Sequence, residues 1–264
     1  MPSKIVIHAG FHKTGTTSVQ QVLHKNAKLL WPHMAIALRH RFPELLHASR
    51  GYSTWRDPLT LAKFAHRFDA FIRALELGPK RQLVISAEEL SGHLPGRGDL
   101  DDYSAAPVLM AEMVNVLEDN FRKPDITFYF STRQPESWLK SAHWEHVKAS
   151  RMTLNYSDYK KRYRGSSDLV QAAKSIADVV APYRVVTHPL EECLALPLGP
   201  AGPLLDLLDL PGFKRAQLLA QPVANAQRPH KVLKEFLKLN RSDLTGEEVG
   251  RAKRDYLAGL AGRV

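Results

Sequence analysis

The amino-acid sequence predicts an α/β fold in three layers, with a mainly parallel central sheet and helices on both of its faces. Two observations support this prediction. Short apolar segments rich in β-branched and aromatic residues alternate along the chain with longer segments whose apolar residues recur every three or four positions. The first apolar segment also runs through a glycine-containing turn directly into a helical segment, in the order strand, loop, helix.

Four segments have the pattern of buried strands. The first contains Ile5, Val6 and Ile7, and the third reads DITFYFST, so both are rich in β-branched or aromatic side chains. The expected strands are residues 4–9, 82–86, 125–132 and 183–187. Because helical segments separate them, the strands are expected to run parallel.

The segments with helical periodicity lie between and after these strands. The first ends before Trp31-Pro32, and the second has Pro58 near its start, where proline is tolerated. The expected helices are residues 18–30, 57–77, 103–121, 136–149, 167–180, 230–239 and 245–260, with residues 195–203 (ALPLGPAGP) as a loop. We expect one domain over residues 1–264, in which about 204–264 form a helical extension packed on the rest.

Composition narrows the function classes. The 264 residues carry a formal net charge of +10, which favours anionic partners such as nucleotides or acidic glycans. A nucleic-acid binder is disfavoured because basic and aromatic residues are not interleaved. No apolar run of about 18 residues exists, so no transmembrane segment is expected. With no leader at Met1 and Cys193 as the single cysteine, the sequence predicts a cytoplasmic location.

The stretch GFHKTGTTS, residues 10–18, differs from the nucleotide phosphate loop G-x-x-x-x-G-K-[ST] at one position. Gly10 and Gly15 have the required separation, and Thr17 fills the Ser/Thr place. Thr16 occupies the lysine position, and Lys13 stands three residues early. A loop without that lysine fits a triphosphate poorly, since the lysine normally reaches the β- and γ-phosphates.

A loop between a strand and a helix N-terminus can still bind an anion. Its backbone N–H groups and the helix dipole point toward one spot. Gly15 allows close approach of the backbone, and the hydroxyls of Thr14, Thr16 and Thr17 can donate further hydrogen bonds. Lys13 supplies a full positive charge that can follow a leaving group.

The stretch GFHKTGTTS resembles the 5′-phosphosulfate loop of sulfotransferases, which use 3′-phosphoadenosine 5′-phosphosulfate as donor. A second family motif matches STRQPESWLKS, in which Arg133, Pro135 and Ser141 stand at the family's positions. The resemblance covers roughly residues 4–190 and implies a P-loop-NTPase-like fold without a metal. It also implies that residues 13–18 together with Arg133 and Ser141 bind the donor, with Arg133 and Ser141 at its 3′-phosphate.

Two features depart from the family. Many members stack a tryptophan on adenine where this chain has Ser18. The family's C-terminal Gly-rich basic loop is missing, and residues 225–231 (NAQRPHK) are the one basic loop placed to substitute for it. Bacterial glycan-type relatives are the most similar, which implies a hydroxyl or amine acceptor on a carbohydrate or other small molecule. A nucleotide kinase or NTPase of related fold is the alternative.

Sulfuryl transfer to a hydroxyl needs a general base near the acceptor. The end of the second expected strand reads ISAEELS, and relatives keep a histidine or glutamate there, so Glu88 is the expected base and Glu89 the runner-up. Two adjacent carboxylates cannot face one ligand if the chain is still extended. His143 is a weaker candidate. Its pairing with His146 in HWEH permits a metal site, but no third ligand is evident, so we expect a helix-surface pair or a cleft lining.

Overall fold

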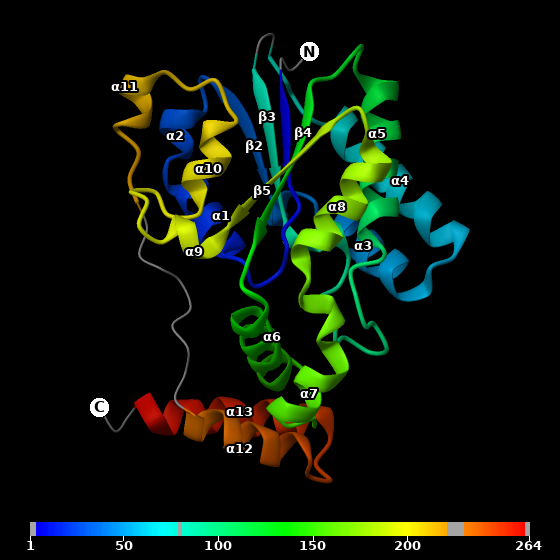
Figure 1. Cartoon of the computed structure of the whole chain (residues 1–264), viewed down its shortest axis with the longest axis vertical. Coiled ribbons are helices and arrows are strands. Elements are labelled where there is room, and N and C mark those ends of the chain that lie inside the picture. The colour runs from blue at the N-terminus through cyan, green and yellow to red at the C-terminus, as the bar shows by residue number, and fades with distance from the viewer. Residues whose placement is uncertain (1–3, 79–80, 221–229, 262–264) are drawn as a thin grey trace.

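The computed structural model describes residues 4–78, 81–220 and 230–261. At its centre lies a five-stranded sheet with the order β2-β3-β1-β4-β5, in which every neighbouring pair is parallel (Figure 1). The predicted α/β class is therefore confirmed, and within the described residues the sheet is entirely parallel. The strands are β1 (Ile5–His8), β2 (Met34–Leu38), β3 (Gln82–Ser86), β4 (Ile126–Thr132) and β5 (Arg184–Pro189).

Helices cover both faces of the sheet, and alternate residues of β1 pack toward opposite faces. Ile5 and Ile7 belong to one apolar cluster, whereas Val6 belongs to another. The first cluster includes side chains of α3 (Pro43–Trp55), α4 (Pro58–Arg73), α5 (Ala106–Asn120) and α8 (Leu169–Val180). The second includes side chains of α1 (Thr16–Lys25), α2 (Ala27–Leu30) and α10 (Ala201–Asp206). This arrangement gives the three predicted layers.

Residues 31–56 contain an unpredicted strand and an unpredicted helix. Strand β2 reads MAIAL, in which the two alanines dilute the β-branched pattern, and it forms an edge of the sheet beside β3. The expected helix 136–149 is α6 (Pro135–Ala149). Shorter elements connect the larger ones: α7 (Tyr156–Tyr163), α9 (Leu190–Cys193), α11 (Gly212–Arg215) and the 3₁₀ helices η1 (Arg39–Arg41), η2 (Glu88–Ser91) and η3 (Gly165–Ser167). The expected helix 18–30 is divided at Asn26, and the expected loop 195–203 already contains the start of α10.

The last two helices, α12 (His230–Asn240) and α13 (Gly246–Ala261), lie side by side and pack against α6 (Figure 1). Val147 of α6 forms a small apolar cluster with Val232 and Phe236. Lys253 Nζ donates a hydrogen bond of 2.7 Å to the carbonyl oxygen of Val147, which ties α13 to the end of α6. The expected extension 204–264 thus divides, because α10 packs on the sheet whereas α12 and α13 pack on α6.

The register of the sheet aligns the carboxyl ends of β1, β3 and β4. His8 pairs with Ser86 on one side and with Tyr129 on the other. The segments that follow these strands therefore leave the sheet at a common edge, the edge where α/β proteins bind ligands. None of the helices in the described ranges is both long and apolar enough to cross a membrane.

Candidate functional site

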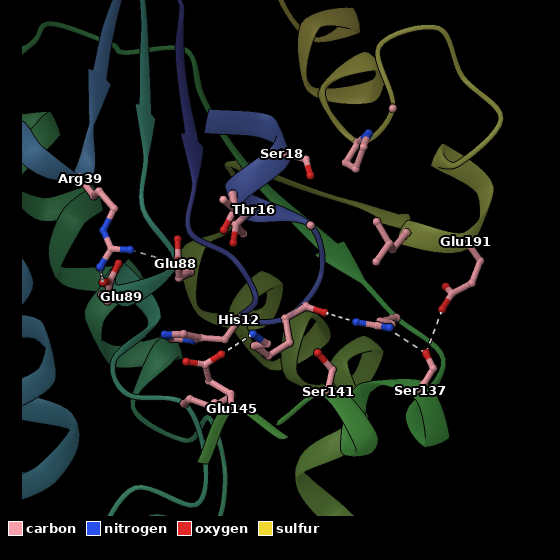
Figure 2. A pocket seen from close by; sticks show the side chains of 18 of the residues that line it. His12, Thr16, Ser18, Arg39, Glu88, Glu89, Ser137, Ser141, Glu145 and Glu191 are labelled. Carbon is pink, nitrogen blue, oxygen red and sulfur yellow. Dashed lines mark hydrogen bonds and ion pairs between the residues drawn. The ribbon is translucent and has the colours of Figure 1, made fainter. Parts of the chain in front are cut away.

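A pocket of about 1090 Å³ opens at the carboxyl edge of the sheet. Its walls come from the loop after β1, the start of α1, η2 and the loop behind it, the inner face of α6, and the segment from α9 to α10 (Figure 2). The residues that carry the chemistry at its surface are Lys13, Thr16, Thr17, Ser18, Arg39, Arg50, Glu88, Glu89, His93, Arg97, Arg133, Ser137, Ser141 and Glu145. Most of the residues predicted from the sequence are thus brought together in one cavity.

Gly15 closes the loop and begins α1, and two properties of its position require glycine. Its φ of 92° is in the left-handed region. A β-carbon there would lie 2.8 Å from Leu190 Cδ1 and 3.0 Å from Pro200 Cγ. Helix α1 starts at Thr16 without an acidic side chain in its first turn, so its free N–H groups and dipole favour an anion in the pocket.

The hydroxyl groups of the loop differ in role. Thr14 is buried, and its Oγ1 donates a hydrogen bond of 2.6 Å to the carbonyl oxygen of Phe11. Thr14 does not line the pocket, which contradicts the expectation that its hydroxyl donates to a ligand. Thr16, Thr17 and Ser18 do line it. The side chain of Thr14 therefore holds the loop in shape.

Lys13 forms an ion pair that the sequence does not predict. Its Nζ lies 2.8 Å from Oε2 of Glu145, and the same oxygen lies 2.9 Å from Nζ of Lys148 (Figure 2). Burial would raise the pKa of the Glu145 carboxyl, but the hydrogen bonds and charges of the two lysines hold it at about 2. Glu145 stands four residues after Ser141 on α6, so the two side chains lie on the same face of the helix. This spacing from Ser141 is the sequence feature from which Glu145 could have been predicted to face the pocket.

Arg133 connects the end of β4 to the loop. Its Nη1 donates to the carbonyl oxygen of Lys13 at 2.9 Å, and its Nε donates to Ser137 Oγ at 2.9 Å (Figure 2). Ser141 lies one turn beyond Ser137 on α6 and also lines the pocket. Glu191 closes this side by accepting a hydrogen bond of 3.0 Å from the backbone N–H of Gln134. The predicted pair Arg133 and Ser141 therefore shares one wall of the pocket with the loop.

Glu88 and Glu89 both line the pocket, because the chain turns into the 3₁₀ helix η2 directly after β3. The condition of an extended chain, under which only one of them could face a ligand, is not met. Glu88 accepts a hydrogen bond of 3.0 Å from Gln20 Nε2, and its Oε1 lies 3.6 Å from Arg39. Glu89 pairs with Arg39 and lies 3.7 Å from Arg50. Burial, followed by the neighbouring charge of Glu88, raises the pKa of Glu89.

His12 and His93 line the pocket as well, although as isolated histidines they carried no signal in the sequence. His12 Nδ1 lies 3.2 Å from the hydroxyl of Tyr103. Burial, followed by the charges of His93 and Lys13, lowers the pKa of His12 to about 3. His12 is therefore a neutral imidazole at physiological pH, next to the loop.

His143 and His146 face away from the pocket and are buried, so neither is on the surface of α6. A ring nitrogen of His143 lies 2.9 Å from the carbonyl oxygen of Leu154, and one of His146 lies 2.7 Å from that of Pro95. In the described ranges, no group of three or more His, Cys, Asp or Glu side chains could hold a metal ion. The two histidines act as structural hydrogen-bond donors, which argues against His143 as an acid-base group.

Four apolar residues of the segment from α9 to α10 line the pocket, and they are Leu190, Leu194, Leu198 and Pro200. Leu190 and Pro200 pack against Gly15 at the start of α1. Residues 225–229 of the basic loop, whose substitution for a family loop was expected, lie outside the described residues.

Fold and pocket together define an α/β protein with a glycine-containing strand–loop–helix segment in a pocket at the carboxyl edge of its sheet. No protein-family model matches the chain. A search of curated proteins also finds no match. Among solved structures, the chain is similar to a sulfotransferase from Alicyclobacillus acidocaldarius, with a TM-score of 0.49 and 16% sequence identity over 91% of this chain and 92% of that one. A likeness at this level carries no inference about chemistry, so the function has to be inferred from the residues of the pocket.

Proposed function

We propose that this protein is a sulfotransferase, which moves a sulfuryl group from 3′-phosphoadenosine 5′-phosphosulfate to a hydroxyl or amine of a small acceptor, such as a carbohydrate. One observation carries the proposal. The loop from Lys13 to Thr17, the guanidinium of Arg133 and the hydroxyl of Ser141 meet in one pocket, although 120 residues separate Lys13 from Arg133. Such an arrangement suits a compact ligand with two separate anionic groups.

The two anionic groups of the donor would be bound by different elements. The free N–H groups at the start of α1 and the hydroxyls of Thr16 and Thr17 would hold the 5′-phosphosulfate. Arg133 and Ser141 would hold the 3′-phosphate, because a guanidinium and a hydroxyl can both donate to its oxygens. The leucines of the α9–α10 segment and Ser18 would line the space for the adenosine. No metal is required, since the loop, Lys13 and Arg133 supply the positive field.

The chemical step breaks the bond from sulfur to the bridging oxygen of the donor and forms one from sulfur to the acceptor oxygen. Negative charge develops on the bridging oxygen as the sulfuryl group leaves. Lys13, at the tip of the loop, would stabilise that charge, an effect that is greatest in the transition state. The product 3′,5′-phosphoadenosine would then dissociate.

The acceptor hydroxyl must lose its proton as it attacks, and Glu88 would accept it. Its carboxylate lines the pocket and keeps its orientation through Gln20 and Arg39. Glu89 is the runner-up, but it is more deeply buried and its carboxylate is engaged with two arginines. A general base held in hydrogen-bond reach contributes roughly 10²–10⁴ to the rate.

Thermal-shift titration with nucleotides tests the proposal. We expect 3′,5′-phosphoadenosine to stabilise the protein without Mg²⁺, and to do so at lower concentration than 5′-AMP or ATP. Stabilisation by ATP that requires Mg²⁺ would instead indicate the nucleotide kinase or NTPase alternative. Equal affinity for 5′-AMP and the 3′,5′-bisphosphate would exclude the 3′-phosphate assignment.

A substitution of Ser141, compared with that of a serine outside the pocket, tests where the 3′-phosphate binds. Ser141→Ala should weaken 3′,5′-phosphoadenosine about tenfold or more and leave 5′-AMP unchanged, because a hydrogen bond to a charged group contributes about 1.5–3 kcal/mol. Ser157→Ala is the matched control, since Ser157 is exposed on α7 and does not line the pocket. Equal losses of both nucleotides in Ser141→Ala would place the 3′-phosphate elsewhere.

A further inference from the structure

The pocket holds more positive charge than its own carboxylates neutralise. Its walls carry six cationic side chains and four carboxylates, which are Lys13, Arg39, Arg50, Arg97, Arg133 and Lys148 against Glu88, Glu89, Glu145 and Glu191. Arg133 and Lys13 belong to the proposed donor half. Of the remaining cations, Arg39 lies 3.6 Å from Glu88, the proposed base, and Arg39 and Arg50 both pair with the adjacent Glu89, on the side of the pocket where an acceptor would have to bind.

Arg97 differs from the other pocket cations because no other described residue pairs with it. Lys13 and Lys148 share Glu145, and Arg39 and Arg50 share Glu89. Arg133 is engaged with the loop and Ser137. Arg97 is half-buried in the pocket wall, and within the described residues it has neither an ion pair nor a side-chain hydrogen bond. A partly desolvated guanidinium without a carboxylate is costly unless a ligand supplies the anion.

The segment that carries Arg97 is held rigidly. Its backbone N–H at Gly96 donates to the carbonyl oxygen of Leu100 at 2.7 Å, which closes a tight turn. His146 donates through Nε2 to the carbonyl oxygen of Pro95 at 2.7 Å, from α6 beneath the turn. Gly96 has a φ of 98°, and a β-carbon there would lie 2.7 Å from the His146 ring. Arg97 therefore projects from a backbone that packing has fixed in place.

His93 lies close enough to Arg50 and Arg97 for both guanidinium charges to act on its imidazole ring. The backbone N–H of His93 donates a hydrogen bond of 3.0 Å to Ser53 Oγ, which ties this segment to α3. The ring of His93 lines the pocket. Burial, followed by the charges of Arg50 and Arg97, lowers the pKa of His93 to about 4. A neutral imidazole beside two guanidinium groups can donate or accept one more hydrogen bond without adding charge.

We infer that Arg97, assisted by Arg50 and His93, forms an anion subsite on the acceptor side, and that the acceptor carries a carboxylate or sulfate in addition to the hydroxyl that is modified. This inference rests on the proposed function, because it assigns the acceptor class of the same pocket. The rigid turn fixes the distance between the subsite and Glu88. An acceptor anchored by its anion would therefore present one particular hydroxyl to the base.

Three sugars that differ at one position test the subsite. The protein is first loaded with 3′,5′-phosphoadenosine, so that the donor half is occupied, and the affinities for glucuronate, glucose 6-sulfate and glucose are measured by NMR titration. We expect at least one anionic sugar to bind about tenfold or more tightly than glucose, and Arg97→Gln to remove that preference while glucose binding stays unchanged. Arg164→Gln is the matched control, because Arg164 is exposed outside the pocket.

Two results would overturn the inference: no preference for either anionic sugar in the wild type, or a preference that survives Arg97→Gln. The comparison of the two anions shows whether a carboxylate or a sulfate is recognised. The titrations are repeated without nucleotide to separate the two proposals. An Arg97-dependent preference in a protein that does not bind 3′,5′-phosphoadenosine would support the subsite and reject the sulfotransferase. Binding of 3′,5′-phosphoadenosine without a preference for an anionic sugar would support the sulfotransferase and reject the subsite.

Discussion

The ammonium group of Lys13 lies 2.8 Å from Oε2 of Glu145, so the loop between β1 and α1 is joined to helix α6 across the pocket. Both side chains are about three-quarters buried, with 21% and 24% exposed, so the pair is only partly screened by solvent. In the proposed reaction, the donor brings a sulfuryl group to the same lysine. Glu145 and the donor therefore compete for the charge of Lys13.

Lys13→Ala should lower kcat about a hundredfold or more and change the Kd of 3′,5′-phosphoadenosine much less. The lysine acts mainly on charge that develops as the sulfuryl group leaves, and a donor of this kind contributes about 10²–10³ in kcat. Turnover is followed as release of 3′,5′-phosphoadenosine with a panel of hydroxyl acceptors, and Kd by calorimetry. Lys140→Ala, an exposed lysine of α6 outside the pocket, is the control. A large rise in Kd with unaltered kcat would make Lys13 an anchor for the donor only.

Glu145→Gln should bind 3′,5′-phosphoadenosine about tenfold more tightly than the wild type at low ionic strength. The substitution removes a negative charge from an anion pocket and releases Lys13, and the gain should diminish as salt is added. Glu136→Gln is the matched control, because Glu136 lies on the same helix and pairs with Lys160 outside the pocket. Weaker nucleotide binding in Glu145→Gln would mean that the pair orients Lys13 for binding and does not compete with the donor.

Glu88→Gln should bind the donor normally and lose transfer by a factor of about 10²–10⁴. Glutamine keeps the shape of the side chain and an oxygen that can accept from Gln20, but it cannot take a proton. Calorimetry of the bound nucleotide and turnover with the acceptor panel give the two readouts. Glu89→Gln is measured in parallel. If Glu88→Gln turns over normally and Glu89→Gln does not, Glu89 is the general base. If both variants are active, His12 becomes the next candidate for the base because it lines the same pocket.

The stability of the protein should fall as the pH is lowered from about 6.5 to about 4, and His146 should contribute to the slope. Burial lowers the pKa of His146 to about 4 from its ordinary value near 6.5. Between these values the unfolded chain binds a proton that the folded protein refuses, so the free energy of unfolding rises with pH by up to about 1.4 kcal/mol per unit for each such group.

His146→Gln tests this contribution. The glutamine amide can still donate to the carbonyl oxygen of Pro95, but it does not titrate. The free energy of unfolding should therefore depend less steeply on pH between 6.5 and 4, by the equivalent of about one proton taken up on unfolding. The measurement is urea unfolding at several pH values. His47→Gln is the control, because His47 is exposed. An unchanged slope in His146→Gln would show that the ring is already protonated in the folded state.

Local patterns were sufficient for the elements that frame the pocket. Four of the five strands follow from runs of buried β-branched and aromatic residues, and the loop follows from two glycines placed between a strand and a helix. Arg133 could be associated with that loop because strands that alternate with helices bring their carboxyl ends to one edge, whereas Ser141 was associated with it only through the resemblance of its motif. The alanine-rich strand β2 was missed, since its place beside β3 depends on a partner distant in sequence and not on its own composition.

The partners inside the pocket were decided by tertiary structure alone. Glu145 pairs with Lys13 over a separation of 132 residues, and the turn that presents Arg97 is held by His146 from α6. Thr14 turns into the loop, whereas His12 and His93, isolated in the sequence, face the cavity. Motifs are read from residues that are neighbours along the chain, and here they led to the loop at residues 10–18 and to Arg133 and Ser141, all of which except Thr14 and the residues before Lys13 are represented in the proposed donor site. The charge balance of a pocket depends on side chains from several elements, which only the packing of those elements brings within a few ångströms of one another.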